Sequence, residues 1–581
     1  MTIASGSTGT TEPAVRHSPP AGFARFGTPV VFGWTFLLSL ALLWPLASPG
    51  MLLLRDMVVP PHPALTDAAF GLGDSAARAT PQDAVLAWVG GLTDAGAVVR
   101  LLLVAGFLFG GLAAAELARR TVGAGLLGQL AAVTMLLWNP FTVERLLQGQ
   151  WSLVLAMVLL PAIVVAGLQG AAWWRAMAMA VAGLTPTGAV LGGVVAVVAA
   201  RTWRDRGVAA LTAMLVSAPW VAVSLPGAVG GGAAEVFSDP SGAAAFAARA
   251  ERHVGTLGAV AGLGGIWNRQ AVPLIREEGP AALAVVGLLA LFAIGAARAW
   301  RPRGDAALNR RLIVLAGLAV AVPALLATPP GLQVMEWALA NLPGAGLARD
   351  AQKFVALAVP GYAILAAAGA ETLAGLLPTA RQWLAGAFAV LIIVSAVPDA
   401  PRAVAELSPV EPWPGWSPVS GLVAMDHTAV AVLPAGSYRI IAGRPTYDPA
   451  VKTLPADVVG TGDLTVSGVT VGGEGTAARD VERALLDAPD TAIDVLRGNG
   501  VGWVLVENSP GEMGDSARVL DQLEVLYEDA ELRLHRVPGA IAYRDDVDRT
   551  PAYAGLALWG LALLAGPVAA VIRDRGAGRR R

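Results

Sequence analysis

Long apolar runs separated by short polar segments make up most of the chain. A helix needs about 20 mostly apolar residues to cross the hydrocarbon core of a bilayer, and many of these runs approach that length. The pattern therefore predicts a polytopic α-helical membrane protein. The predicted spans lie at 29–47, 97–118, 122–138, 152–170, 207–226, 280–299, 312–328, 353–376, 383–398 and 551–572.

Residues 176–200 form a further apolar run, but arginines flank it on both sides. Because positively charged loops stay in the cytoplasm, a single crossing would place one flank on the wrong side. The sequence Gly-Leu-Thr-Pro-Thr-Gly at 183–188 is expected to break the helix at Pro186. We predict two half-helices that enter and leave on the same side, buried in protein because broken backbone cannot face lipid. One kinked span is the alternative. With this pair the chain has about twelve helical segments.

Arginine clusters beside the span ends predict the orientation, because such clusters stay cytoplasmic. They lie at Arg119–Arg120, Arg175, Arg201–Arg206, Arg298–Arg311, Arg381 and Arg573–Arg581. We therefore expect a multi-pass plasma-membrane protein with both termini in the cytoplasm. The predicted regions are a disordered cytoplasmic N-terminus at 1–28, a multi-span domain at 29–398 with an external loop at 48–96, an external domain at 399–550, a final span at 551–572 and a basic cytoplasmic tail at 573–581.

The external block 399–550 has the pattern of a small α+β domain. Strands are predicted at Ala429–Leu433, at Tyr438–Ala442 and at 502–507, with a hairpin over 525–537 that turns at 528–531. Helices are predicted at about 477–497 and 515–525. We expect this domain to stand outside the membrane.

Composition narrows the function classes. Only 14% of the 581 residues are charged, against ~25% in soluble domains, so a soluble enzyme is excluded. The formal net charge of −2 provides no basic field for nucleic acid. With no cysteine there is no disulfide or thiolate metal site. His62 and His253 stand alone, so no metal site or cofactor is predicted, although a divalent cation stays open.

Polar residues gather in the segments predicted to be external. The candidates are Asp56, Asp67 and Asp74 in the first loop, Asn139, Glu144, Arg145 and Gln150 in the second segment, and Arg349, Asp350 and Lys353 at the start of a later span. A carboxylate there can act as a general base on a hydroxyl, and arginine or lysine can hold a phosphate. The structural alternatives are a solvated loop carboxylate, a helix end with a solvated ion pair, and cations at the membrane interface.

This layout resembles the GT-C superfamily of polytopic glycosyltransferases, which use polyprenyl-phosphate-linked sugars. The shared features are an aspartate soon after the first span, short paired helices in the middle and an external C-terminal domain. The stretch 139–151 resembles actinobacterial membrane proteins of this type. Arg-Asp-Ala-Gln-Lys-Phe at 349–354 is similar to a motif of arabinofuranosyltransferase-like members, and 500–506 with 532–537 resembles the small domain that ends many such chains.

The resemblance implies that Asp56 is the catalytic carboxylate. It would deprotonate an acceptor hydroxyl in an inverting displacement that expels the lipid phosphate. Many members carry two adjacent acids at this place, whereas Arg55 precedes Asp56 here. Asp67 or Asp74 is therefore the candidate for a second carboxylate.

The implied function is transfer of a sugar from a polyprenyl-phosphate donor to a cell-envelope glycan or glycolipid. The arginine-rich, alanine- and glycine-rich composition suits a high-GC actinobacterium, and by analogy with the resembling enzymes of such organisms the expected sugar is arabinofuranose or mannose. Arg349 and Lys353 would bind the donor phosphate, supported by Asn139, Glu144, Arg145, Gln150 and Asp350. A lipid-linked glycan flippase or transporter and a catalytically inactive assembly scaffold are the alternatives. Charges deep in the spans would favour transport.

Overall fold

The fold comes from a computed structural model of the chain. It describes residues 29–73, 77–229, 237–301, 305–426, 428–466, 468–473, 475–542 and 547–578. The predicted cytoplasmic lead at 1–28 and the candidate Asp74 lie outside the described residues.

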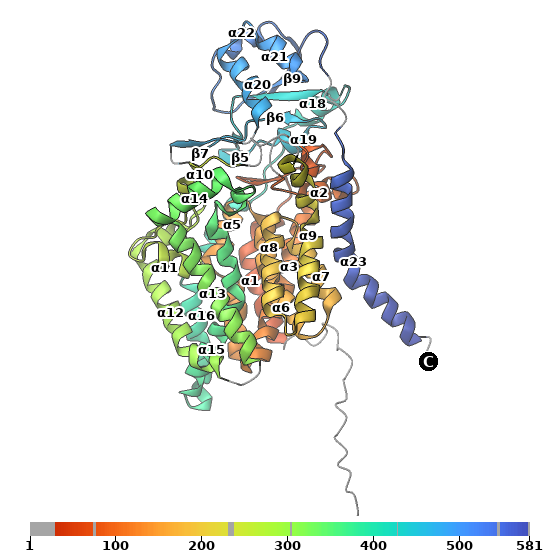
Figure 1. The fold of residues 1–581 in the computed structure, drawn as a ribbon. Helices are drawn as coiled ribbons and strands as arrows, with labels where there is room; N and C mark the ends of the chain where they lie inside the picture. Colours follow the sequence, from red (N-terminus) through yellow and green to blue (C-terminus); the bar gives the residue numbers. More distant parts are fainter. Residues whose placement is uncertain are drawn as a thin grey trace, which may run out of the picture.

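A helical bundle makes up the larger part of the molecule (Figure 1). Among the described residues, nine helices are long and apolar enough to cross a membrane. They are α1 with η2 (Pro29–Ala47), α3 (Ala95–Val122), α4 with α5 (Leu126–Leu137 and Pro140–Leu147), α6 (Trp151–Leu168), α9 (Trp203–Val229), α12 (Gly279–Trp300), α13 (Ala306–Leu326), η8 with α15 (Ala351–Ala358 and Val359–Gly375) and α23 (Thr550–Gly578). The prediction of a polytopic helical membrane protein is confirmed.

Two helices, α6 and α15, lie at the centre of the bundle. Both are buried over nearly their whole length, as expected for a helix that is apolar on every side. Glycines allow the close approach of α15 and α12. A Cβ added at Gly295 or at Gly369 would lie 2.5 Å from a backbone atom of the other helix. Such small-residue crossings are typical of packing between membrane helices.

The predicted pair of half-helices is present as α7 (Ala172–Ala182) and α8 (Pro186–Ala199). The Thr185 hydroxyl accepts a hydrogen bond from the Gly188 backbone N–H and so caps α8, while Pro186 occupies the first turn of that helix. The pair packs against α6, α9 and α23, so its broken backbone is buried in protein. The carbonyl of Leu184, at its apex, accepts a bond from the Gln82 N–H at 3.1 Å.

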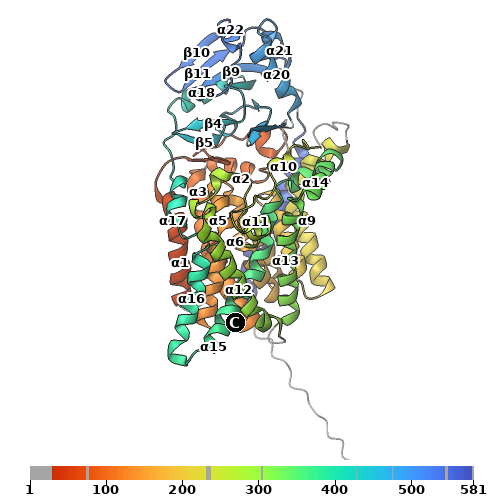
Figure 2. The ribbon, with the colours of Figure 1, turned by 90° about the vertical axis from the view of Figure 1, so that its left-hand side faces the viewer.

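A sheet-containing unit stands on one end of the bundle (Figures 1 and 2). Its main sheet has the strand order β10-β11-β9-β3-β6, antiparallel from β10 to β9 and parallel from β9 to β6. These strands are β3 (Ala429–Leu433), β6 (Val458–Val459), β9 (Val501–Glu507), β10 (Glu524–Glu528) and β11 (Leu532–Arg536). We call this end of the bundle the sheet end.

Helices cover both faces of this sheet, because side chains alternate along each strand. From β9, Val504 packs toward α20 (Thr476–Asp487), α21 (Ala492–Gly498) and α22 (Ser516–Leu520). Its neighbours Trp503 and Leu505 face the opposite layer, α18 (Trp416–Val423) and α19 (Ala450–Thr453). The single helix predicted at 477–497 is wrong, since the chain breaks at 488–491, where Pro489 cannot continue α20.

Short hairpins join the unit to the bundle. They are β1–β2 (Leu52–Leu54 and Met57–Val59), β4–β5 (Tyr438–Ile441 and Arg444–Tyr447) and β7–β8 (Leu464–Val466 and Val469–Val471). The backbone N–H and carbonyl of Arg55 bond to Pro445 and Tyr447 of the second hairpin, both at 2.8 Å. The loop that carries the β1–β2 hairpin is thereby tied to the sheet-containing unit.

The remaining helices are short. They are α2 (Gln82–Gly90), α10 (Gly242–Ala245), α11 (Gly255–Ala261), α14 (Pro329–Asn341), α16 (Gln382–Val394) and α17 (Ala400–Ala403). After the sheet-containing unit, α23 packs against α7 and α9 and extends to Gly578, through part of the predicted basic tail.

Candidate functional site

Asp56 lies in the two-residue turn between β1 and β2. The preceding residue, Arg55, has a positive φ of 48° and a buried side chain. Its guanidinium donates to the carbonyls of Leu147 at 2.5 Å and Gln270 at 2.7 Å, and pairs with Glu406 at 3.2 Å. Arg55 therefore fastens the turn to three other segments, which fixes where the Asp56 carboxylate points.

The half-buried Asp56 carboxylate joins the bundle to the sheet-containing unit. The hydroxyl of Tyr438, on β4, donates to Oδ1 at 2.6 Å, and Gln150 Nε2 donates to Oδ2 at 3.0 Å. Burial and the negative charge of Asp56 raise the pKa of the Tyr438 phenol well above its usual range. The phenol therefore keeps its proton and remains a hydrogen-bond donor to the carboxylate.

The loop that carries Gln150 approaches the Asp56 turn very closely. Gly149 has a φ of 85°, and a Cβ placed there would lie 2.2 Å from the Met57 N and 2.4 Å from the Leu54 O. Only glycine fits such a backbone conformation and contact. Asn139 stabilises the opposite end of α5, because its Oδ1 accepts a hydrogen bond from the Thr142 N–H and so caps the helix.

Arg145, on α5, is completely buried and extends the network from Gln150 toward η8. It donates to Gln150 Oε1 at 2.8 Å and binds both oxygens of Asp350, at 2.6 and 3.0 Å. Arg145 also donates a hydrogen bond to the side-chain Oε1 of Gln352. Burial raises the pKa of Asp350, but the charge and hydrogen bonds of Arg145 outweigh it, so the pKa lies below its usual value. The pair is thus ionised and bidentate.

The predicted phosphate ligands lie beside this pair. Lys353 and Arg349 both act electrostatically on the Asp350 carboxylate. The Lys353 Nζ lies 5.8 Å from the centre of the Phe354 ring, and the Arg349 guanidinium lies 4.2 Å from that of Phe246. Asp56, Gln150, Arg145 and Asp350 therefore form one connected network, with two cations at its far end.

Arg78 adds a further cation from the first external loop. It is within electrostatic range of Lys353, Tyr438 and Tyr447. Tyr447 packs edge-on against Tyr438, with ring centres 5.8 Å apart, and burial raises its pKa to about 12. Two phenols, with the positive charge of Arg78 near them, thus lie beside Asp56.

Glu144 belongs to a different cluster from its neighbour Arg145. Its Oε2 accepts a bond from the Ile266 N–H at 3.1 Å, and it lies near the buried ion pair of Glu251 and Arg276. Both Glu144 and Arg145 have no exposed surface, so the alternative of a solvated pair is wrong. We interpret Glu144 as part of the architecture that supports the segment from Glu251 to Arg276.

Among the described candidates of the first loop, Asp67 has no such bond to Asp56. Asp67 pairs with Arg549 at 2.5 Å, just before α23, and its role as a second carboxylate stays a prediction. His62 Nδ1 contacts the carbonyl of Gly90 at 2.6 Å. Within the described ranges, no three His, Cys, Asp or Glu side chains come together as a metal site requires.

Sequence reasoning missed Tyr438, Arg78 and Gln352 as members of this site. Tyr438 enters the sequence analysis only as the start of a predicted strand, and Arg78 belongs to no predicted motif. Of the three, only Gln352 had a signal in the sequence, because it lies inside the 349–354 motif. Tyr438 and Arg78 are brought to the site only by tertiary contacts, which no local sequence pattern indicates.

Comparisons with known proteins support the architecture. No protein-family model and no curated protein sequence matches the chain. Among solved structures, the cryo-EM structure of the arabinofuranosyltransferase AftD from mycobacteria superposes with a TM-score of 0.56 at 16% identity, covering 88% of this chain and 40% of that one. A mutant of the same protein gives a TM-score of 0.50 at 17% identity, covering 88% and 41%.

The chain therefore spans about two fifths of the AftD chain, and the likeness lies in the fold. The membrane bundle and the small sheet-containing unit agree with the architecture expected from the sequence. The chain shares its membrane fold with the part of AftD on which it superposes.

Proposed function

We propose that this chain is a membrane glycosyltransferase that moves a sugar from a polyprenyl-phosphate donor to a cell-envelope glycan or glycolipid. The observation that carries the proposal is the network from Asp56 through Gln150 and Arg145 to Asp350, with Arg349 and Lys353 beside it. A carboxylate and the cations for a phosphate thus lie at the sheet end of a fold shared with an arabinofuranosyltransferase.

Asp56 acts as the general base in this proposal. Its carboxylate takes the proton of an acceptor hydroxyl, and the oxygen attacks the anomeric carbon of the donor sugar. As the new C–O bond forms, the bond from that carbon to the phosphate oxygen breaks, with inversion at the carbon. The lipid phosphate leaves with the bonding electrons, and the proton stays on Asp56 until solvent accepts it.

Arg349 and Lys353 stabilise the negative charge that develops on the leaving phosphate. Arginine can bind two phosphate oxygens at once, and lysine supplies a compact charge. Preorganised cations of this kind act most strongly where water is excluded, and Arg145 already sets the geometry of this region through Asp350. Gln150 and Tyr438 are positioning residues, because each holds one oxygen of Asp56.

The donor sugar and the orientation belong to the same proposal. The fold shared with an arabinofuranosyltransferase favours arabinofuranose over mannose. The sheet end, with region 399–550, faces the outside of the cell, and both termini lie in the cytoplasm. This orientation agrees with the arginine clusters between the helices at the opposite end.

A transfer assay tests the proposal. Membranes containing the full chain are given radiolabelled arabinofuranose or mannose on polyprenyl phosphate, and label in envelope glycan is measured. We expect Asp56→Asn to lose about 10²–10⁴-fold in rate at equal expression, since a general base contributes that much. Asp94→Asn is the matched control: Asp94 caps α3 at the same end, and asparagine caps equally well.

The outcomes separate the alternatives. Equal activity of wild type and Asp56→Asn would show that the base lies elsewhere. Absence of transfer by wild type from both donors would contradict the proposal and favour a transporter or an assembly scaffold.

A further inference from the structure

A groove opens at the end of the bundle opposite the sheet end. It encloses about 470 Å³ between the last turn of α8 and the first turns of α9 and α13. The apex of the α7–α8 pair contacts Gln82 of the first external loop, so the far end of α8 marks the opposite membrane surface. Arg206, Arg310 and Arg311 line the groove together with valines and leucines.

The two kinds of side chain are separated along the groove. On α13, Arg311, Val314 and Leu318 follow the spacing of one helix face. With a rise of 1.5 Å per residue, Leu318 lies about 10 Å further into the bundle than Arg311. Val314 and Leu318 are 53% and 55% exposed, so the apolar wall is open on its outer side. The groove thus has a cationic mouth and an apolar wall beneath it.

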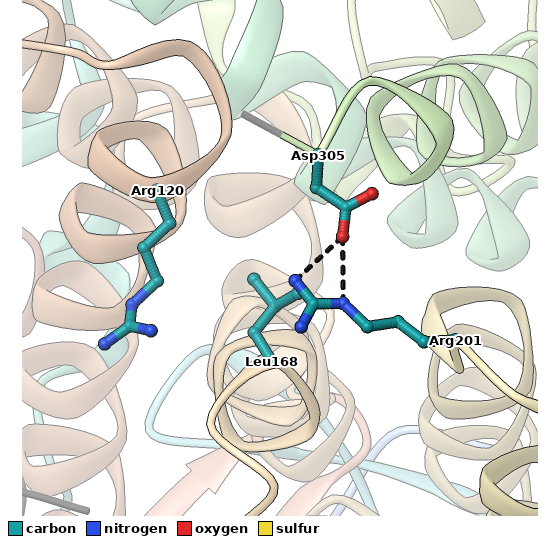
Figure 3. Close-up of a pocket in the computed structure, with 4 residues that line it drawn as sticks. All are labelled: Arg120, Leu168, Arg201 and Asp305. Atoms are coloured by element: carbon teal, nitrogen blue, oxygen red, sulfur yellow. Dashed lines mark hydrogen bonds and ion pairs between the residues drawn. The ribbon is translucent and has the colours of Figure 1, made fainter. Parts of the chain in front are cut away.

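The nearby carboxylates are already paired. Asp305 binds Arg201 at 2.8 Å, and Figure 3 shows this guanidinium turned toward the carboxylate, with Arg120 on the other side of the neighbouring pocket. Asp205 binds Arg175 at 2.7 Å.

The arginines of the groove lack such partners. No ion pair within the described segments uses Arg206, Arg310 or Arg311. Arg310 and Arg311 donate to backbone carbonyls, among them the carbonyl of Ala200 at 2.5 Å. Arg206 also lies within electrostatic range of Arg311. Arg206 and Arg311 therefore repel each other; Asp305 offsets part of this repulsion, and a bound anion would offset more of it.

We propose that this groove binds one anionic glycerophospholipid. Its phosphate contacts Arg206, Arg310 and Arg311, and an acyl chain lies along Val314 and Leu318. The tendency of arginine to stay on the cytoplasmic side explains cations at this end, but not an apolar groove directly beneath them. A phospholipid matches this groove, because its anionic head group would meet the arginines and its acyl chain the apolar wall. Basic pockets between membrane helices recognise lipid head groups in this way.

Native mass spectrometry of the full chain in detergent tests this site. The probes are palmitoyl-oleoyl phosphatidylglycerol, the matching phosphatidylcholine, dihexanoyl phosphatidylglycerol and inorganic phosphate. We expect wild type to bind the long-chain anionic lipid at least tenfold more tightly than phosphatidylcholine. The variant Arg206→Gln/Arg310→Gln/Arg311→Gln should lose about a hundredfold in that affinity, since each interfacial arginine contributes about a factor of five.

The control variant carries Arg204→Gln, Arg301→Gln and Arg381→Gln, which remove three exposed charges from the same end outside the groove. Equal losses in the two triple variants would overturn the proposal, because general surface charge would then suffice. Equal affinity for both long-chain lipids would also overturn it. So would equal affinity for inorganic phosphate or the short-chain lipid, since the apolar wall would then contribute nothing. Thermal unfolding of each variant verifies that it is folded. The result does not depend on any transferase activity.

Discussion

The buried pair of Arg145 and Asp350 gives the sharpest test of how the site is built. Arg145 has no exposed surface and Asp350 is 7% exposed, and they share two hydrogen bonds. Breaking such a pair by removing one partner costs about 3–5 kcal/mol, because the remaining charge stays buried without compensation. Replacing both partners with apolar residues costs much less.

The surroundings predict which single variant is worse. In Arg145→Met, the Asp350 carboxylate still has Lys353 and Arg349 nearby. In Asp350→Leu, the remaining groups are Arg145, Arg349 and Lys353, all of the same sign. We therefore expect Asp350→Leu to lie at the upper end of about 3–5 kcal/mol and Arg145→Met at the lower end. The double variant should recover about 2–3 kcal/mol relative to the sum of the two.

Thermal unfolding of the purified chain, followed by tryptophan fluorescence, measures these differences. We expect a Tm decrease on the order of 5 °C for each single variant and a smaller one for the double variant. Arg518→Met is the control, because its ion pair with Asp490 is exposed and contributes little. Single variants with wild-type Tm, or a double variant as unstable as the sum, would refute the reasoning.

The pH dependence of this pair has a defined sign. The pKa of Asp350 is lower in the folded chain than the value of about 3.9 in an unfolded one. Its contribution to stability is therefore fully present above that value and is lost as pH falls through the folded pKa. The Tm difference between wild type and Asp350→Leu should thus stay constant from pH 8 to 5.

Two further variants probe the turn that carries Asp56. Tyr438→Phe removes a charge-assisted hydrogen bond of about 1.5–3 kcal/mol, so we expect about a tenfold or greater loss in kcat of the transfer reaction, with KM little changed and a Tm decrease of only a few degrees. A Tm decrease as large as that of the Arg145 and Asp350 single variants would instead indicate a merely structural role for Tyr438. Gly149→Ala should lower both Tm and activity, because its Cβ would lie 2.2 Å from the Met57 N; wild-type values in both assays would contradict the close approach.

Local signals in the sequence were sufficient for much of the fold. The half-helix pair follows from Thr185 and Pro186, which cap and start α8 whatever surrounds them. The strands of the main sheet follow from short apolar runs between turn residues. Pro489 carried the signal for the break between α20 and α21, but the repeating apolar face on both sides hid it.

The site was predictable only where its residues are neighbours in sequence. Glu144 and Arg145 were identified together, yet successive helix residues point about 100° apart, so the two serve different clusters. Tyr438 stands 382 positions from Asp56, and no local pattern connects them. Arg55 stands where many GT-C members carry a second acid. In the structure it binds two carbonyls and a carboxylate from distant segments.

The join between the first hairpin and β5 also sets an order of events during biosynthesis. Ribosomes make the Asp56 turn early, while the backbone partners of Arg55 at 445 and 447 emerge almost four hundred residues later. Until then, the turn lacks both those two bonds and the Tyr438 hydroxyl. A nascent chain that has inserted its early helices therefore carries the Asp56 carboxylate in an unfinished setting. The turn gains these bonds only once the polypeptide has grown past β5, so a chain that ends earlier lacks them.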